Sequence, residues 1–322
     1  MTKEIGGYFE LEYFDGLSYH EGGIALNSGR GCLSYLTELR GIQSIWIPDF
    51  MCDSVKNCFE RDGVLVQEYP VTTDFLPFYS DIAFESNSWF YLMDYYGTLE
   101  KEAVEQAYSF SQGRLIIDET QSYFQQPWEN ADTLYTCRKW FGVSDGAYLF
   151  TKENKQLSRA LPVDYSYSRM EYMLGRFERS ANEFFEQSQA NNSYFDDQPA
   201  KAMSRITRNL LKAINYQAVE ERRFNNWRIL HDNLSVINKL KLQNPKSAPF
   251  MYPFLVENTS EVRGKLASMK IYVPTLWPNV AQKEDGSVAC NFAKNILPLP
   301  VDQRYDEEDM NRVLEALRIC LN

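Results

Sequence analysis

The sequence has few of the residues that build metal centres or disulfide frameworks. It contains only two histidines, His20 and His231, and none of its six cysteines forms a C-x-x-C pair. Structural zinc sites and disulfide-rich secreted folds depend on such pairs and clusters. We therefore expect no metal site and no disulfide framework, and we expect a protein of the reducing cytoplasm.

The sequence also lacks a long apolar run and an excess of basic residues. No stretch approaches eighteen uncharged apolar residues, and no apolar run follows a basic start at the N-terminus, so we predict neither a membrane span nor a signal peptide. The formal net charge of −11 argues against nucleic acid or an anionic membrane as the main partner. An anionic ligand would need a local basic or amide-rich pocket.

What is present predicts an α/β protein. The chain is 322 residues long and 44% hydrophobic, which exceeds the usual size of a single core and provides enough apolar material for two. Short apolar runs alternate with amphipathic segments up to residue 150, as expected for β-α units and a mainly parallel, seven-stranded sheet. The predicted strands are residues 24–26, 44–47, 65–69, 89–93, 114–117, 133–136 and 147–151, and the predicted helices between them are 30–40, 52–61 and 99–111.

The pattern changes in the second half of the chain. Residues 165–192 are aromatic and charged and are predicted to be helical, and 201–240 are predicted to form one or two long helices. A strand at 250–256, a helix at 262–269, a strand at 271–273 and a final helix at 307–321 predict a small α+β module. We predict a large domain over 1–200 and a small C-terminal domain with its connecting helices over 201–322, with residues 1–20 packing on the small domain.

The first candidate site lies between a predicted strand and a predicted helix. Asn27-Ser28-Gly29-Arg30-Gly31 offers free amides at a helix N-terminus and a cation at Arg30, which suits a phosphate. A Ser-capped helix after a glycine turn is a simpler interpretation of Ser28, Gly29 and Gly31. The stretch also matches part of a dinucleotide fingerprint, with Asp49 at a later strand end.

Two further candidates follow later strands. Asp118 and Gln121 come at the end of the strand predicted over 114–117, where side chains of a parallel sheet face the ligand crevice. Lys139 follows Thr136 and lies among aromatic residues after the next strand. Desolvation and the neighbouring Arg138 would favour the neutral amine that imine chemistry needs, although most lysines are solvated surface groups.

These three places together resemble the DegT/StrS family of sugar aminotransferases. The resemblance implies the type I fold of enzymes that use pyridoxal 5′-phosphate (PLP). It implies that Ser28-Gly29-Arg30 binds the phosphate, that Asp118 and Gln121 contact the ring, and that Lys139, followed by Ser144-Asp145-Gly146, forms the covalent bond to PLP. Thr136 is expected to contact the phosphate. The implied substrates are an amino acid donor such as glutamate and a nucleotide-linked keto-sugar, and the implied assembly is a homodimer.

The resemblance has departures, and alternatives to it stay open. Cys52 stands where an aromatic ring often stacks on the cofactor, for which Phe50 or Tyr95 is a substitute, and the Gly-Asn-x-x-Arg segment that usually reaches the neighbouring subunit is missing. A nicotinamide-dinucleotide-binding oxidoreductase and a non-catalytic relative of the PLP fold with a binding or regulatory role remain the two alternatives.

Overall fold

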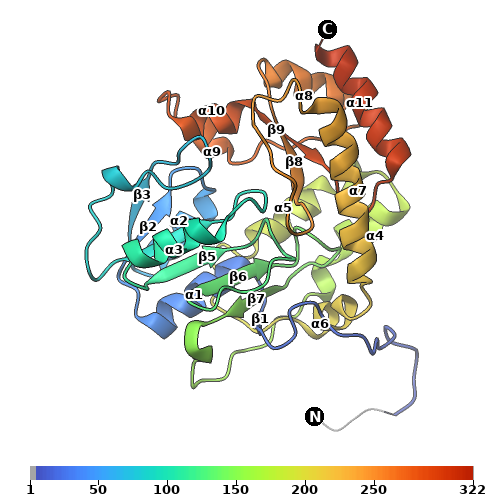
Figure 1. The fold of residues 1–322 in the computed structure, drawn as a ribbon. Coiled ribbons are helices and arrows are strands. Elements are labelled where there is room, and N and C mark those ends of the chain that lie inside the picture. The colour runs from blue at the N-terminus through green and yellow to red at the C-terminus, as the bar shows by residue number, and fades with distance from the viewer. Residues whose placement is uncertain (1–4, 322) are drawn as a thin grey trace.

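A seven-stranded sheet forms the centre of the computed structural model, which describes residues 5–321 (Figure 1). The strands are arranged in the order β1-β7-β6-β5-β4-β2-β3. Their bounds are β1 Ile24–Leu26, β2 Ser44–Pro48, β3 Leu65–Tyr69, β4 Trp89–Met93, β5 Leu115–Asp118, β6 Asp132–Thr136 and β7 Ala147–Phe150. Each lies within one residue of its prediction at either end, and the predicted mainly parallel sheet is confirmed.

The direction of each strand decides which residues share an edge of the sheet. Strands β2 to β6 run parallel to one another, whereas β7 is antiparallel to both β6 and β1. Two reversals make β1 run in the same direction as β6. The carboxyl ends of β1, β4, β5 and β6 therefore lie at one edge, which is where ligands bind in α/β sheets.

Three helices follow the early strands and pack on the sheet. They are α1 Gly29–Arg40, α2 Asp53–Arg61 and α3 Lys101–Phe110. Helix α1 begins at Ser28, whose Oγ accepts a hydrogen bond from the Gly31 amide, and ends at Gly41 in the left-handed conformation that glycine adopts without strain. Its buried residues Leu33 and Leu36 belong to the core of the sheet.

The C-terminal part has its own sheet and core, above the large sheet in Figure 1. Two strands pair antiparallel, and the final helix packs against α7 and α8. The elements are α6 Arg205–Leu211, α7 Tyr216–Leu234, β8 Met251–Leu255, α8 Thr259–Ser268, α9 Pro278–Ala281, α10 Val288–Asn295, β9 Ile296–Pro300 and α11 Glu307–Leu321. Apolar side chains of α7, α8, β8, β9 and α11 form a core separate from that of the large sheet.

Two predictions in this half need correction. The strand predicted at 271–273 is wrong, because β8 pairs with β9 instead and residues 271–273 stay irregular with Ile271 packed in the core. The helical segment 165–192 is broken into short pieces, η3 Tyr167–Arg169, α4 Glu171–Glu178, η4 Ala181–Phe184 and α5 Phe185–Ser193. Region 201–240 forms two helices, α6 and α7, which agrees with the predicted one or two helices.

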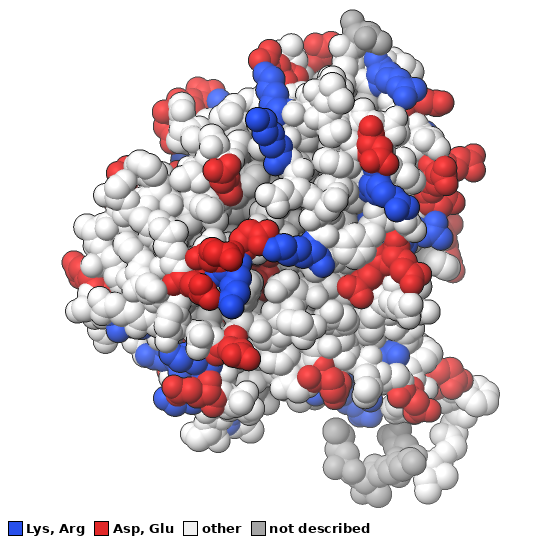
Figure 2. All heavy atoms as spheres, viewed as in Figure 1, with Lys and Arg blue, Asp and Glu red and all other residues white. Residues whose placement is uncertain are grey.

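The surface carries charges of both signs. On the face seen in Figure 2, acidic and basic side chains are interspersed over both halves of the molecule. No helix within residues 5–321 combines the length and the apolar character that crossing a membrane requires.

Candidate functional site

The turn that precedes α1 lies against the glycine turn that precedes β7. The Gly146 amide donates to the Asn27 carbonyl at 2.7 Å, and the Cys137 amide donates to the Gly146 carbonyl at 3.0 Å. A Cβ atom at Gly31 would lie 2.6 Å from Asn27 Oδ1, so glycine is needed at this position. The start of α1 and the segment around Lys139 are thus brought to the same end of the sheet.

The segment after α5 covers the start of α1. Arg30 forms an ion pair with Asp196 and donates to the Asn192 carbonyl at 2.8 Å. Arg138 donates to Asn192 Oδ1 at 2.6 Å, and burial lowers its pKa to about 10. Arg30 therefore lies at the start of α1 with its charge paired to that of Asp196.

Asp118 lies at the carboxyl end of β5 and is only 3% exposed. Its Oδ2 accepts from the Tyr91 hydroxyl at 2.5 Å, and its Oδ1 accepts from the Thr120 amide at 2.7 Å. Both donors are neutral, so they stabilise the ionised carboxylate without cancelling its charge.

Gln121, three residues further along, is buried beside Asp118. Its Oε1 accepts from the Tyr96 amide at 2.9 Å, which fixes the orientation of the side chain. The amide nitrogen is then the end of Gln121 that can donate to a ligand.

Lys139 lies beside the turn that carries Asp118 and Gln121. Its Nζ donates to Thr120 Oγ1 at 3.0 Å and lies 5.8 Å from the centre of the Phe250 ring. The expected desolvation is not observed, since Lys139 is exposed whereas its neighbours Cys137 and Trp140 are buried. The amine thus reaches the sheet edge from the solvent side.

Thr136 is buried at the end of β6, where it pairs with Ala147 of β7. It shares the sheet edge with Ser28, but its hydroxyl takes part in no hydrogen bond among the described residues. The structure therefore brings Thr136 to the expected edge without a contact to the start of α1.

A second buried carboxyl pair lies next to Asp118. Asp94 follows β4 and accepts from the Leu99 amide at 2.9 Å, and Glu119 accepts from Trp128 Nε1 at 2.6 Å. Burial, and then the neighbouring Asp94, raise the pKa of Glu119 well above its usual value. Glu119 is therefore the carboxyl of this pair that holds a proton more readily.

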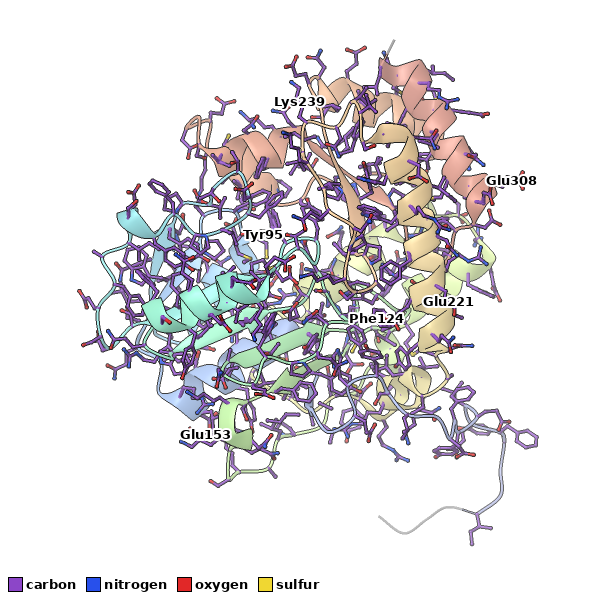
Figure 3. All side chains as sticks on the ribbon, in the orientation of Figure 1. Tyr95, Phe124, Glu153, Glu221, Lys239 and Glu308 are labelled. Atoms are coloured by element: carbon purple, nitrogen blue, oxygen red, sulfur yellow. The ribbon has the colours of Figure 1, made fainter. Side chains whose placement is uncertain are left out.

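The two candidate stacking rings pack in the core. The rings of Phe50 and Tyr95 stack with their centres 5.2 Å apart, and the Tyr95 hydroxyl donates to the Phe50 carbonyl at 2.6 Å. Tyr95, labelled in Figure 3, also meets Trp277, which lies just before α9. The Phe50 ring also contacts Phe75 and Trp277, so both rings are packed against core neighbours.

The topology contradicts the dinucleotide fingerprint. That motif needs its first two strands adjacent, so that the acid at the end of the second reaches the ligand on the first. Here four strands separate β1 from β2. Asp49 instead accepts from the Val71 amide at 3.1 Å, and burial raises its pKa to about 6.

The donor set at this edge fits PLP. A buried carboxylate with neutral donors suits a protonated pyridine nitrogen, and a lysine amine lies beside the same turn. Amides at the start of α1 suit a phosphate, and a Cβ atom at Gly29 would meet nothing within 4 Å.

Comparison with solved structures identifies the fold. The putative sugar aminotransferase Spr1654 from Streptococcus pneumoniae, in its PLP form, matches with a TM-score of 0.67 and 13% identity over 92% of this chain and 86% of its own. DesV of S. venezuelae, in complex with a ketimine intermediate, matches with a TM-score of 0.67 and 14% identity, over 92% of this chain and 84% of its own. NtdA from Bacillus subtilis with bound PMP matches with a TM-score of 0.66 and 12% identity, over 92% of this chain and 72% of its own.

The chain therefore has the α/β fold of these sugar aminotransferases, as the sequence resemblance implied. No protein-family model and no curated protein matches the sequence itself. At this low identity the likeness shows the fold, and the role of each residue rests on the geometry.

Three residues of the site were not singled out from the sequence for a role. Asp94 and Glu119 are charged residues directly after buried strands, a signal that could have marked them. Tyr91 lies inside β4, and only the pairing of β4 with β5 brings its hydroxyl to Asp118.

Proposed function

We propose that this protein is a PLP-dependent aminotransferase that transfers an amino group to a keto-sugar. One observation carries the proposal: Lys139 Nζ lies 3.0 Å from Thr120 Oγ1, within the turn that joins Asp118 to Gln121. An amine, a buried carboxylate and an oriented amide thus meet at the carboxyl edge of a fold shared with sugar aminotransferases.

Each residue has a separate task in this proposal. Bound PLP supplies an electron sink for the carbon that loses its proton. Lys139 would hold the cofactor by condensing its amine with the aldehyde carbon, with loss of water, and once released would move a proton between substrate and cofactor. Asp118 holds a proton on the ring nitrogen, Gln121 donates to the ring hydroxyl, and Ser28 to Gly31, with Thr136, bind the phosphate.

The proposed substrates are an amino acid donor such as glutamate and a nucleotide-linked keto-sugar acceptor. Support comes from two proteins of similar fold, the putative sugar aminotransferase Spr1654 and the sugar aminotransferase CalS13 from Micromonospora echinospora. The exposed approach to Lys139 leaves its amine accessible to such a substrate.

A spectrum of the purified protein tests the proposal. PLP added to the protein should give a visible absorbance that borohydride bleaches, and peptide mapping should then find the pyridoxyl label on Lys139. Glutamate alone should convert the bound cofactor from its aldehyde to its amine form, so no sugar is needed for this test. A Lys139→Ala variant is the control, and a label on another lysine would contradict the assignment.

A non-catalytic binding role is the second candidate. It is favoured by Arg30, which is neutralised by Asp196 rather than free for a phosphate. In that case the protein would take up no PLP, and glutamate would cause no spectral change.

We further propose that the protein is a homodimer. Five large apolar side chains around α4 and α5 are more than 60% exposed, namely Tyr165, Tyr167, Leu174, Phe177 and Phe185. Other aromatic residues of this segment pack internally. The guanidinium carbon of Arg169, for example, lies 3.8 Å from the centre of the Tyr194 ring. Large homodimer interfaces are enriched in such aromatic residues, which supports this face as the contact.

A further inference from the structure

We propose that Tyr91 is a positioning residue that holds the Asp118 carboxylate in the orientation needed to face the ring nitrogen of the cofactor. The inference rests on the proposed function and adds a residue to its site. The Tyr91 hydroxyl contacts Asp118, so Tyr91 acts by orienting another group.

The register of the sheet explains how the two residues meet. In the parallel pair β4 and β5, Met93 lies opposite Asp118, and Tyr91 lies two positions earlier on the same face of β4. Diagonal neighbours on adjacent strands are within reach of an aromatic side chain. The Tyr91 hydroxyl accordingly ends 2.5 Å from Asp118 Oδ2.

The position of Tyr91 is fixed from several sides. Its side chain is fully buried, its ring meets Phe59 edge to face at 6.2 Å, and its carbonyl accepts from the Tyr69 hydroxyl at 2.8 Å. Asp118 has its second anchor in the Thr120 amide. One donor on each oxygen fixes the plane of the carboxylate and leaves each oxygen a further lone pair for a ligand.

The chemistry of the donor suits this task. A lysine or arginine here would neutralise Asp118 and compete with a protonated ring nitrogen, whereas a phenol stabilises the anion without a charge of its own. Burial, and then the charge of Asp118, raise the pKa of Tyr91 well above its usual value, so the hydroxyl keeps its proton and remains a donor.

A double-mutant cycle on PLP binding tests the inference. We expect Tyr91→Phe to weaken PLP binding at least about tenfold, since a hydrogen bond to a buried charge is lost. In an Asp118→Asn background the same change should alter the dissociation constant by less than about twofold, because the residue through which Tyr91 acts is already neutral. A purely structural role would weaken binding equally in both backgrounds.

Tyr135→Phe is the matched control. Tyr135 is a buried tyrosine of the same sheet whose hydroxyl has no partner within the described chain, so its loss should leave PLP binding unchanged. Equal effects of Tyr91→Phe in both backgrounds, or none in either, would overturn the inference while leaving the proposed function intact. A parent protein that binds no PLP would overturn both.

A second measurement covers the case in which Tyr91→Phe does not fold. Site-specific 3-fluorotyrosine at position 91 keeps the hydroxyl, and its fluorine resonance reports on the group next to Asp118. We expect PLP to shift this resonance in the parent background and much less in the Asp118→Asn background. A fluorine resonance that does not shift when PLP is added in the parent background would overturn the inference.

Discussion

Arg30 at the start of α1 is paired with Asp196, which follows α5, so two segments far apart in the chain meet over the candidate phosphate site. Asn192 strengthens the contact by accepting from both Arg30 and Arg138. The same chain therefore supplies both the candidate anion site and the group that competes for its cation.

Removing the competing carboxylate should improve phosphate binding. The Asp196 side chain is 52% exposed, and half-exposed ion pairs contribute up to about 1 kcal/mol. We expect Asp196→Asn to tighten PLP binding about two- to fivefold at low salt, as measured by titration of the apoprotein. Asp197→Asn, next to it, is the control. Unchanged or weaker binding in Asp196→Asn would remove Arg30 from the phosphate site.

Asp118→Asn should separate cofactor binding from turnover. An amide cannot stabilise a protonated ring nitrogen as an anion does, and each lost pKa unit of that pairing corresponds to about 1.4 kcal/mol. We expect PLP to bind and the glutamate-driven conversion to slow by about a hundredfold or more. Stopped-flow absorbance measures this rate, and a rate equal to that of the parent would exclude the proposed role of Asp118.

Glu119→Gln should make the protein more stable at alkaline pH. Because the pKa of Glu119 is raised by burial and by Asp94, the folded state keeps a proton that the unfolded state releases once the pH exceeds about 4.5. Stability is therefore lost as pH rises above that value towards the folded-state pKa. Glutamine keeps a donor for Asp94 and an acceptor for Trp128 without this loss.

Thermal unfolding between pH 5 and pH 8 checks the Glu119 prediction. We expect parent and Glu119→Gln to unfold at similar temperatures at pH 5, and the variant to unfold a few degrees higher at pH 8, about 2–4 °C for each kcal/mol. Glu129→Gln, on the exposed part of the same loop, should show no such difference. If the unfolding temperature of Glu119→Gln instead falls relative to that of the parent as pH rises, Glu119 is ionised in the folded state.

Phe177→Glu should weaken the proposed dimer. Phe177 on α4 is 93% exposed, and a charge there would be costly to bury in an apolar interface. We expect light scattering at micromolar protein to detect a shift from dimer to monomer. Val236→Glu is the control, at a side chain 92% exposed after the end of α7. A parent protein that is monomeric, loaded with PLP and active would contradict a site shared between subunits.

The edge of the sheet was predictable because its signals are local. Short apolar runs located the strands, and the order of strand and helix implied a parallel sheet, so Asp118 and Lys139 could be assigned to one edge. The contacts between Tyr91 and Asp118 and between Arg30 and Asp196 were not predictable, because they depend on register and on packing between distant segments.

The small sheet shows why local propensity misled. Residues 271–273 have the β-branched and aromatic side chains typical of a strand, whereas β9 contains Pro298 and Pro300, which argue against one. In a sheet of only two strands both are edge strands, so the missing proline N–H groups can face away from the partner. The tertiary arrangement therefore decided which segment pairs with β8.

The position of β1 has a consequence for how the protein assembles. Ile24 pairs only with Leu149 of β7, so the first strand of the chain must wait for the last strand of the sheet before it can dock. Closing so long a loop costs entropy before any contact is gained, and such non-local pairing slows folding. During synthesis, the turn at Ser28 would thus form after the parallel strands have associated, and in a fragment ending before β7 the strand that leads to this turn would lack its partner.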